Sequence, residues 1–290
     1  MNRLMVELFF STLNGAKSGE PIQLVIDKLT KLGLQNIEIS SGHPFEQNFF
    51  QTLLHYKKKG IRFLLHNFSP PDEKSTLVNL SNPDKKEREK VIDFIKKRID
   101  LTKELGMDYY SFHGGFRMPN YSFTEDNSNP ELIPYDTALS LFVSGLKEIA
   151  SYAELRGINI GFENHVVVKG NEEKLITYKT EEIESVFDSI NSKNLFLHLD
   201  VGHLDVTSRT VGLDKKAFIK KFADSVFAIH LHSNNSLEDQ HLMINEDHWI
   251  LPSLPIFTKL KYIIFETNSP LTKETAGSVI DIVRGALKKP

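Results

Sequence analysis

Histidines and acidic residues end a series of short apolar runs along the whole chain. In order they are Glu38, His66, His113, Glu163, Asp200 with His203, His230 followed by Asp239 and His241, and Glu266. Imidazole and carboxylate groups suit Zn, Mn or Co as ligands, and a carboxylate can also move a proton beside a carbonyl. The chain contains no Cys, so thiolate metal sites and disulfides are excluded. These residue types indicate a divalent metal centre with acid–base chemistry.

The elements that must position these side chains follow a regular alternation. Apolar runs predict strands at residues 4–10, 36–39, 61–65, 109–112, 158–162, 195–199, 226–231 and 262–265. Helical spacing of apolar residues predicts helices from about residue 21 to Gly33, from Asn82 (the cap) and Pro83 to Gly106, and at 45–59, 135–155, 180–190, 214–222, 254–259 and 273–287. Strands buried on both sides read as continuous apolar runs. The pattern predicts an α/β fold, a single-domain (β/α)8 TIM barrel over residues 1–290.

An open doubly wound sheet is the competing architecture. It usually carries a glycine-rich turn after its first strand, and no such turn follows residues 4–10. A barrel needs about 250 residues, so a chain of 290 leaves room for long loops. We expect the loops at residues 114–134, 166–179 and 233–252 to wall an active site.

Barrel enzymes place their chemistry where the strands run into the following loops. The residues that end seven consecutive strands would then converge on one volume. Carboxylates crowded together repel each other and resist desolvation unless a cation neutralises them. We therefore expect a divalent metal site that holds Zn, Mn or Co.

Other polar residues lie beside this ring or away from it. We expect His43 and His55 to face solvent and His198 to be packed, while His165, His232 and His248 flank the ring. The residues predicted to contact a substrate are Glu38, His165, His232, Arg117 and Trp249, with Arg117 as a partner for a phosphate group.

Composition sets limits on partners and location. The formal net charge of -3 gives no argument for a nucleic-acid or membrane partner, although it leaves room for a local basic groove. No apolar stretch approaches the roughly 20 residues of a membrane span, and the first residues lack the layout of a signal peptide. We expect a cytoplasmic protein, and a homo-oligomer is compatible with the sequence.

Six short motifs in a fixed order resemble the xylose isomerase-like TIM barrel superfamily. They are Ser-Phe-His-Gly-Gly at 111–115, Gly-Phe-Glu-Asn at 161–164, Leu-Asp-Val-Gly-His at 199–203, Ile-His-Leu-His at 229–232, Asp-Gln-His at 239–241 and Phe-Glu-Thr-Asn at 265–268. This superfamily includes sugar-phosphate isomerases and epimerases, inosose dehydratases and endonuclease IV-type DNA repair enzymes. The resemblance covers essentially the whole chain.

The resemblance implies specific ligand sets. The isomerase and epimerase branch would hold one metal ion with Glu163, Asp200, His230 and Glu266. The endonuclease branch would hold three zinc ions and add His66, His113, His203, Asp239 and His241. By that resemblance, His66 and His113 would share one ion with Glu163, and His203, Asp239 and His241 would form the third site.

Departures from the motifs separate the two branches. Gly114 stands where the endonucleases have Pro, and Val201-Gly202 stand where they have Thr-Cys, a form more like the sugar isomerases. Ser236, six residues after the strand-seven His, stands where ketose 3-epimerases carry a substrate-binding Arg. The chain is therefore not a standard member of either group.

We predict a metal-dependent isomerase, epimerase or related lyase that acts on a small sugar, sugar phosphate or polyol through an enediolate. Glu163 and Glu266 would be the metal-bound acid–base pair, and His203 would orient substrate hydroxyls. One alternative is an endonuclease IV-like trinuclear-zinc phosphodiesterase acting on abasic DNA. The other is a barrel that binds a sugar without catalysis, which the presence of both glutamates disfavours.

Overall fold

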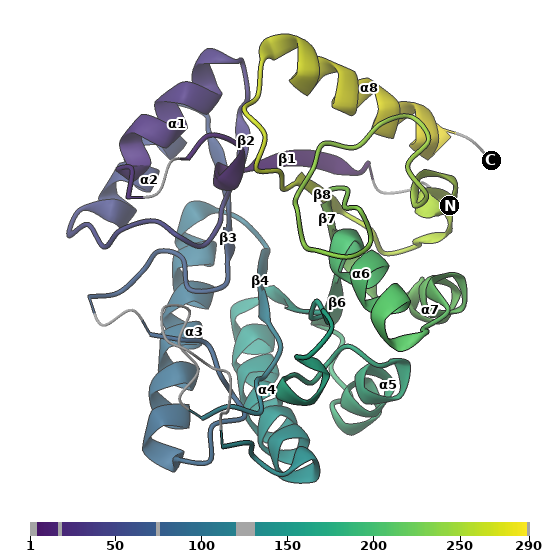
Figure 1. Ribbon diagram of the computed structural model, residues 1–290. Coiled ribbons are helices and arrows are strands. Elements are labelled where there is room, and N and C mark those ends of the chain that lie inside the picture. The colour runs from purple at the N-terminus through teal and green to yellow at the C-terminus, as the bar shows by residue number, and fades with distance from the viewer. Residues whose placement is uncertain (1–4, 17–18, 74–75, 120–130, 289–290) are drawn as a thin grey trace.

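The computed structural model describes residues 5–16, 19–73, 76–119 and 131–288. Eight parallel strands pair in chain order and close into a barrel (Figure 1). The strands are β1 (Glu7–Ser11), β2 (Asn36–Ile39), β3 (Arg62–His66), β4 (Tyr109–His113), β5 (Asn159–Glu163), β6 (Leu195–Asp200), β7 (Val226–Leu231) and β8 (Tyr262–Phe265). The predicted (β/α)8 barrel is confirmed. Leu4, in the predicted strand at 4–10, and residues 120–130, in the predicted loop at 114–134, lie outside the described residues.

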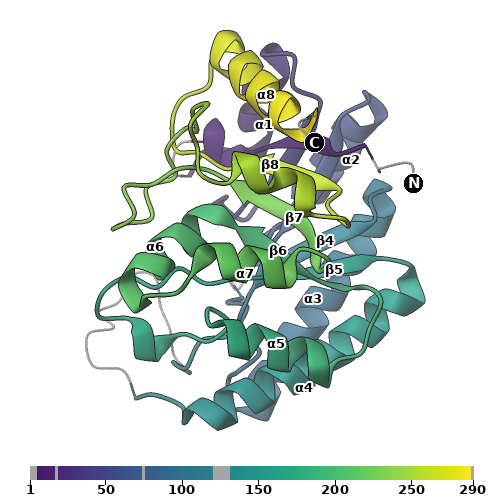
Figure 2. The same ribbon diagram turned by 90° about the vertical axis from the view of Figure 1, so that its right-hand side faces the viewer.

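Helices surround the strands, as the side view shows for α4 and α5 (Figure 2). They are α1 (Ile22–Lys31), α2 (Phe49–Lys58), α3 (Lys85–Leu105), α4 (Tyr135–Arg156), α5 (Thr180–Ser189), α6 (Val201–Val211), α7 (Lys215–Phe222) and α8 (Lys273–Lys288), with short 3-10 helices η1 (Thr12–Asn14), η2 (Glu172–Lys174) and η3 (Leu251–Ile256). None of the helices in the described ranges is both long and apolar enough to cross a membrane.

The pairing register brings the polar strand ends to the same level. His113 on β4 is the register partner of Glu163 on β5, and Asp200 on β6 is the partner of His230 on β7. Register partners on neighbouring parallel strands point to the same face of a sheet. The strand ends therefore present these side chains side by side inside the barrel.

Three local predictions are corrected. Helix α3 begins at Lys85 and is capped by Asp84, whose carboxylate accepts from the backbone N–H groups of Lys86 and Glu87; Asn82 accepts from the N–H of Asp84 in the preceding turn. Helix α6 was not predicted, and it begins directly at the end of β6. The predicted helix at 254–259 is the 3-10 helix η3, because prolines at 252 and 255 remove backbone donors that an α-helix needs.

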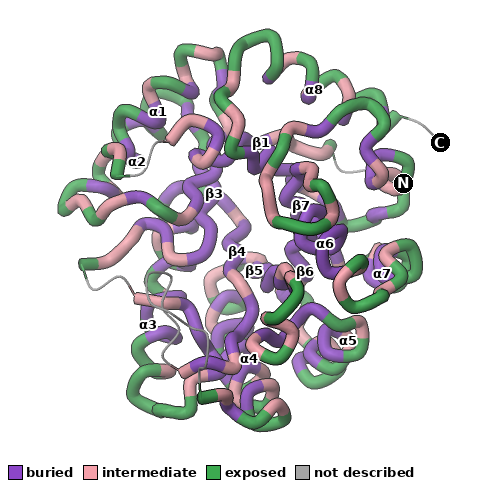
Figure 3. The backbone as a smooth tube through the Cα atoms, in the orientation of Figure 1, coloured by how far each residue is buried: buried purple, intermediate pink, exposed green. Residues whose placement is uncertain are grey.

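Buried residues gather on the strands and on the inner faces of the helices (Figure 3). His198 is fully buried and its Nδ1 lies 3.0 Å from the hydroxyl of Tyr109, so its predicted packing is confirmed. His55 is exposed as expected. His43, expected to face solvent, is buried instead, because its Nε2 hydrogen-bonds to the hydroxyl of Thr12 at 2.7 Å.

Candidate metal centre

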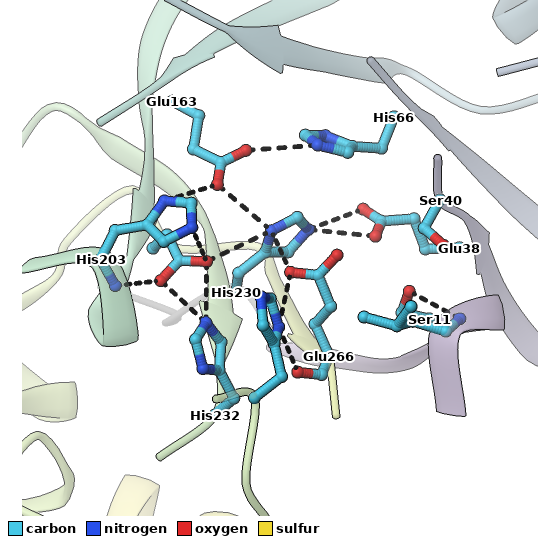
Figure 4. Close-up of polar contacts among 12 residues, drawn as sticks. Ser11, Glu38, Ser40, His66, Glu163, His203, His230, His232 and Glu266 are labelled. Carbon is cyan, nitrogen blue, oxygen red and sulfur yellow. Dashed lines mark hydrogen bonds and ion pairs between the residues drawn. The ribbon is translucent and has the colours of Figure 1, made fainter. Parts of the chain in front are cut away.

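His230 lies at the centre of three carboxylates (Figure 4). Its Nδ1 is 3.2 Å from Glu266 Oε2, 3.6 Å from Glu163 Oε1 and 3.7 Å from Asp200 Oδ2. All four side chains are buried. They come from the ends of β5, β6 and β8 and from within β7, so the fold assembles the four residues that the sequence selected as the core of the site.

The opposite nitrogen of His230 has a different partner. Nε2 lies 3.0 and 3.1 Å from the two carboxylate oxygens of Glu38 on β2. Donation of the Nε2 hydrogen to Glu38 leaves Nδ1 as the nitrogen that faces the three carboxylates. Histidines that ligate metals typically donate their second ring N–H to a carboxylate or carbonyl in this way.

Imidazole and carboxylate groups shift each other's pKa values in the metal-free centre. Burial lowers the pKa of His230, but Glu266, Glu38 and Glu163 outweigh burial and raise this pKa well above the ordinary histidine value. Burial raises the pKa of Glu163, and although burial also acts on Asp200, His203 and His232 lower the pKa of Asp200 to about 2. Protonated imidazole thus supplies the positive charge that buried carboxylates require.

The residues fit a bound cation. Both carboxylate oxygens of Glu163 and Nδ1 of His230 are buried without a hydrogen-bond partner. Buried polar groups in folded proteins almost always have a partner, and leaving one without a partner costs about 1–3 kcal/mol. A divalent ion among these atoms would satisfy all of them at once, and carboxylate with imidazole suits Zn, Mn or Co.

A second group of candidate ligands shares Glu163. The Nε2 atoms of His66 and His113 lie 3.3 and 3.7 Å from Glu163 Oε2. Ser111 lies 3.0 Å from Nδ1 of His66 and so leaves Nε2 to face the carboxylate. Burial lowers the pKa of His66 to about 3, so this imidazole is neutral and available as a ligand.

A third group lies beside the first, between the end of β6 and the loop after β7. Nε2 of His203 and Nε2 of His241 lie 3.3 and 3.0 Å from Asp239 Oδ2. The backbone carbonyl of Asn164 lies 2.9 Å from Nδ1 of His203, which leaves Nε2 to face Asp239. His232 completes a set of four side chains whose ligand atoms lie within 4.8 Å of one another. The fold therefore brings together all nine residues predicted as metal ligands.

A cavity of about 740 Å³ opens above these groups. Its polar lining includes His66, His113, Glu163, His165, His203, Asp239, His241 and Glu266. Its remaining walls come from loops and include residues that the sequence did not single out, namely Leu13, Ser40, Ser41, Gly42, Asn67, Phe68, Leu77, Val78, Phe116, Val166, Asn171 and Leu175. All three loops predicted to wall the site, at residues 114–134, 166–179 and 233–252, contribute to this lining. The sequence did not indicate which of their residues face the cavity, because that depends on tertiary contacts.

Only one of the five predicted substrate contacts lines this cavity. His165 does so, and its Nε2 has no hydrogen-bond partner. Glu38 contacts Nε2 of His230, and Nε2 of His232 lies 3.0 Å from both oxygens of Asp200. Both residues therefore contact candidate ligands and do not line the cavity.

The other two predicted contacts are held elsewhere. Arg117 donates its Nε hydrogen to the carbonyl of Ile133, and Trp249 packs beneath the ammonium group of Lys215 beside a different hollow, the one between η3 and α8. His248 lines that same hollow.

The closed parallel barrel and its buried cluster of imidazole and carboxylate groups define a (β/α)8 protein with a candidate metal centre. Residues 26–278 match the family described as xylose isomerase-like TIM barrel, and the chain belongs to that family. It is similar to the uncharacterized protein MJ1311 of Methanocaldococcus jannaschii, with 25% identity over 65% of this chain and 58% of that protein. The chain thus spans less than two thirds of that relative.

Two solved structures show the same fold over nearly the whole chain. One is a D-tagatose 3-epimerase-like protein, with a TM-score of 0.73, 20% identity, and coverage of 98% of this chain and 97% of that one. The other is the IolI protein with a bound zinc atom, with a TM-score of 0.69, 17% identity, and coverage of 98% and 100%.

Proposed function

We propose that this protein is a metal-dependent isomerase or epimerase, or a related lyase, that acts on a small sugar or polyol carrying a carbonyl group. The observation that supports it most directly is the convergence of Glu163 and Glu266, from strands on different sides of the barrel, on Nδ1 of His230. The similar solved structures, which include a D-tagatose 3-epimerase-like protein, favour the same chemistry.

Glu163, Asp200, His230 and Glu266 would hold the principal ion. When bound, such an ion polarises a substrate carbonyl and stabilises the charge that develops on the enediolate. Glu38 would hold His230 in the tautomer that ligation needs.

The two glutamates would move the proton. One carboxylate removes the hydrogen from the carbon beside the carbonyl, and a carboxylate on the other side returns a proton to the opposite face, which inverts that carbon. Return to the neighbouring carbon would instead interconvert an aldose and a ketose. His203, which lines the cavity, would orient a substrate hydroxyl.

A trinuclear phosphodiesterase is the second candidate, because the two outer ligand groups are also assembled. That reaction uses metal-activated hydroxide and further ions at the leaving oxygen. Against it, the cavity has no Lys or Arg among its described lining residues, whereas nucleic-acid binding relies on basic contacts to phosphate.

One experiment separates the candidates. The purified protein is loaded with Zn²⁺, Mn²⁺ or Co²⁺, its metal content is measured, and it is assayed against a panel of ketoses and against an abasic-site duplex. We expect exchange of the carbon-bound hydrogen with solvent deuterium and formation of an epimer or isomer. Strand cleavage with three tightly held zinc ions, and no sugar turnover, would refute the proposal.

A further inference from the structure

The cavity above the candidate metal centre has two contrasting surfaces. Its floor consists of imidazole and carboxylate groups, and no Lys or Arg occurs among the described residues that line it. Much of the rest is apolar, from the loops that follow β1, β3, β4 and β5, and comprises Leu13, Phe68, Leu77, Val78, Phe116, Val166 and Leu175. We call these seven residues the apolar wall.

The apolar wall is a packed structure rather than a chance exposure of side chains. Phe116 and Leu175 form an antiparallel bridge that joins the loop after β4 to the loop after β5. Both belong to a separate hydrophobic cluster that also contains Met118, Val167 and Tyr178. Leu77 packs against this cluster, whereas Val78 belongs to the main core and Phe68 packs against that core, so both hydrophobic clusters support the wall.

Most polar side chains between these surfaces are bonded within the protein, whereas Oδ1 of Asn67 and Nε2 of His165 have no hydrogen-bond partner. The hydroxyl of Ser40 lies 3.0 Å from that of Thr12, and the hydroxyl of Ser41 accepts from the side-chain amide of Asn67. The carbonyl oxygen of the Asn171 side chain accepts from the N–H of Val168. A substrate hydroxyl placed against the wall would lose its water partners and gain few in return, which is costly for a polar group.

The charges near the cavity also disfavour an anionic substrate. Glu163, Asp239 and Glu266 line it, and the imidazoles of His203 and His241, which also line it, are already paired with Asp239 at 3.3 and 3.0 Å. Arg117, in the loop after β4, donates to the carbonyl of Ile133 and lies over the ring of Tyr135. A phosphate group would thus meet carboxylates and would find no Lys or Arg among the described residues that line the cavity.

We infer that the substrate is uncharged and has an apolar end, as in a terminally deoxygenated sugar, rather than a sugar phosphate or a sugar hydroxylated at every carbon. The hydroxy-carbonyl end would lie over the metal centre and the deoxygenated end against the apolar wall. This inference rests on the proposed isomerase function and specifies its substrate class.

The test compares three compounds that differ only at carbon 6: a ketohexose, its 6-deoxy analogue and its 6-phosphate. Two configurations are used, D-tagatose and D-fructose, with the metal-loaded protein. We expect kcat/KM for the 6-deoxy compound to exceed that of the parent by about tenfold, because one polar or apolar group in a matched pocket changes kcat/KM by about this factor. The 6-phosphate should fall at least about 100-fold below the parent.

If the compounds are turned over but their kcat/KM values are equal or follow the reverse order, the inference is overturned and the proposed function stands. If none of the six compounds reacts, the proposed function fails for ketohexoses, and the order of their dissociation constants by calorimetry decides the inference. Tightest binding by the 6-deoxy compounds supports it. Tightest binding by the phosphates or parents, or no binding at all, overturns it.

A charge placed in the wall provides a matched variant. Leu77→Arg should raise the 6-phosphate to 6-deoxy ratio of kcat/KM, or of affinity, at least about tenfold. Leu24→Arg is the control, because Leu24 is half exposed on α1 and does not line the cavity. An unchanged ratio in folded Leu77→Arg would overturn the inference, and if that variant does not fold, the wild-type ratios decide.

Discussion

The carboxylate of Glu38 lies 3.0 and 3.1 Å from Nε2 of His230, and this contact orients the centre of the site. It joins β2 to β7 across the barrel interior, 192 residues apart in the chain. Because Nε2 donates to Glu38, Nδ1 faces Glu163, Asp200 and Glu266. The two nitrogens of one imidazole thus connect a supporting carboxylate with the candidate ligands.

Glu38→Gln should weaken metal binding by about 10- to 100-fold, the usual effect of losing the outer partner of a ligating histidine. The amide can offer a hydrogen to Nε2 and favour the tautomer whose Nδ1 carries the proton. Competition with a chromophoric chelator measures the affinity. Glu148→Gln, at an exposed partner of Lys96, is the control, and equal affinities in the two variants would contradict the role given to Glu38.

Glu163→Gln and Glu266→Gln should each lower kcat by at least about 10²- to 10⁴-fold, the contribution typical of a positioned acid or base. Each also removes a candidate ligand, so metal content is measured together with turnover. Steady-state kinetics at saturating metal ion separates the two effects. Normal activity in either variant would refute the proposed acid–base pair.

Gly202→Ala should disturb the site through His232. A Cβ at Gly202, in the first turn of α6, would lie 2.0 Å from Cε1 of His232, the ring that contacts Asp200. We expect a loss of about 1–3 kcal/mol in the free energy of unfolding, as for other overpacked sites, and weaker metal binding. Urea titration and metal competition measure the two effects.

Gly277→Ala in α8 is the matched control. A Cβ there meets nothing within 4 Å, so we expect a gain of about 0.5–1 kcal/mol from helix propensity and unchanged metal binding. If both glycine variants behaved alike, the steric argument about His232 would fail.

Metal binding should release protons and strengthen as the pH rises. Burial lowers the pKa of His241, but its hydrogen bond to Asp239 and the charge of Glu266 raise the pKa to about 9. His241 is therefore protonated at pH 7 in the metal-free protein, and an ion bound in the third group of candidate ligands must displace that proton. Calorimetry in buffers of different ionisation enthalpy counts the protons. His241→Gln should remove about one of them if the third group binds an ion, and none if only the principal ion binds.

The raised pKa of His241 also sets how the free energy of unfolding of the metal-free protein depends on pH. A histidine whose pKa rises from 6.5 to about 9 on folding contributes stability that is complete below pH 6.5 and is lost as the pH rises through 9. Chelator-treated protein should therefore lose unfolding free energy across this window. His241→Gln should lose less and His55→Gln, at an exposed site, should match the wild type; equal slopes in all three would contradict the assignment.

The sequence by itself determined the barrel and the identity of the candidate ligands. Apolar runs that alternate with amphipathic segments specify strands and helices, and in a parallel barrel every strand delivers its last residues to the same end. For this reason the histidines and carboxylates at the strand ends could be grouped from one chain without coordinates, and the family resemblance singled out Glu163, Asp200, His230 and Glu266 among them. Their order along the sequence matches their order around the barrel.

Tertiary structure alone decided how these residues are supported and which side chains of the predicted loops enclose them. Glu38 and His232 were predicted to touch substrate, but they contact His230 and Asp200 and are not among the residues that line the cavity. His43 was predicted to be exposed and is buried against Thr12. The apolar wall, likewise, consists of loop residues brought together by packing between loops. Such contacts join residues far apart in the chain, so the local periodicity of the sequence cannot predict them.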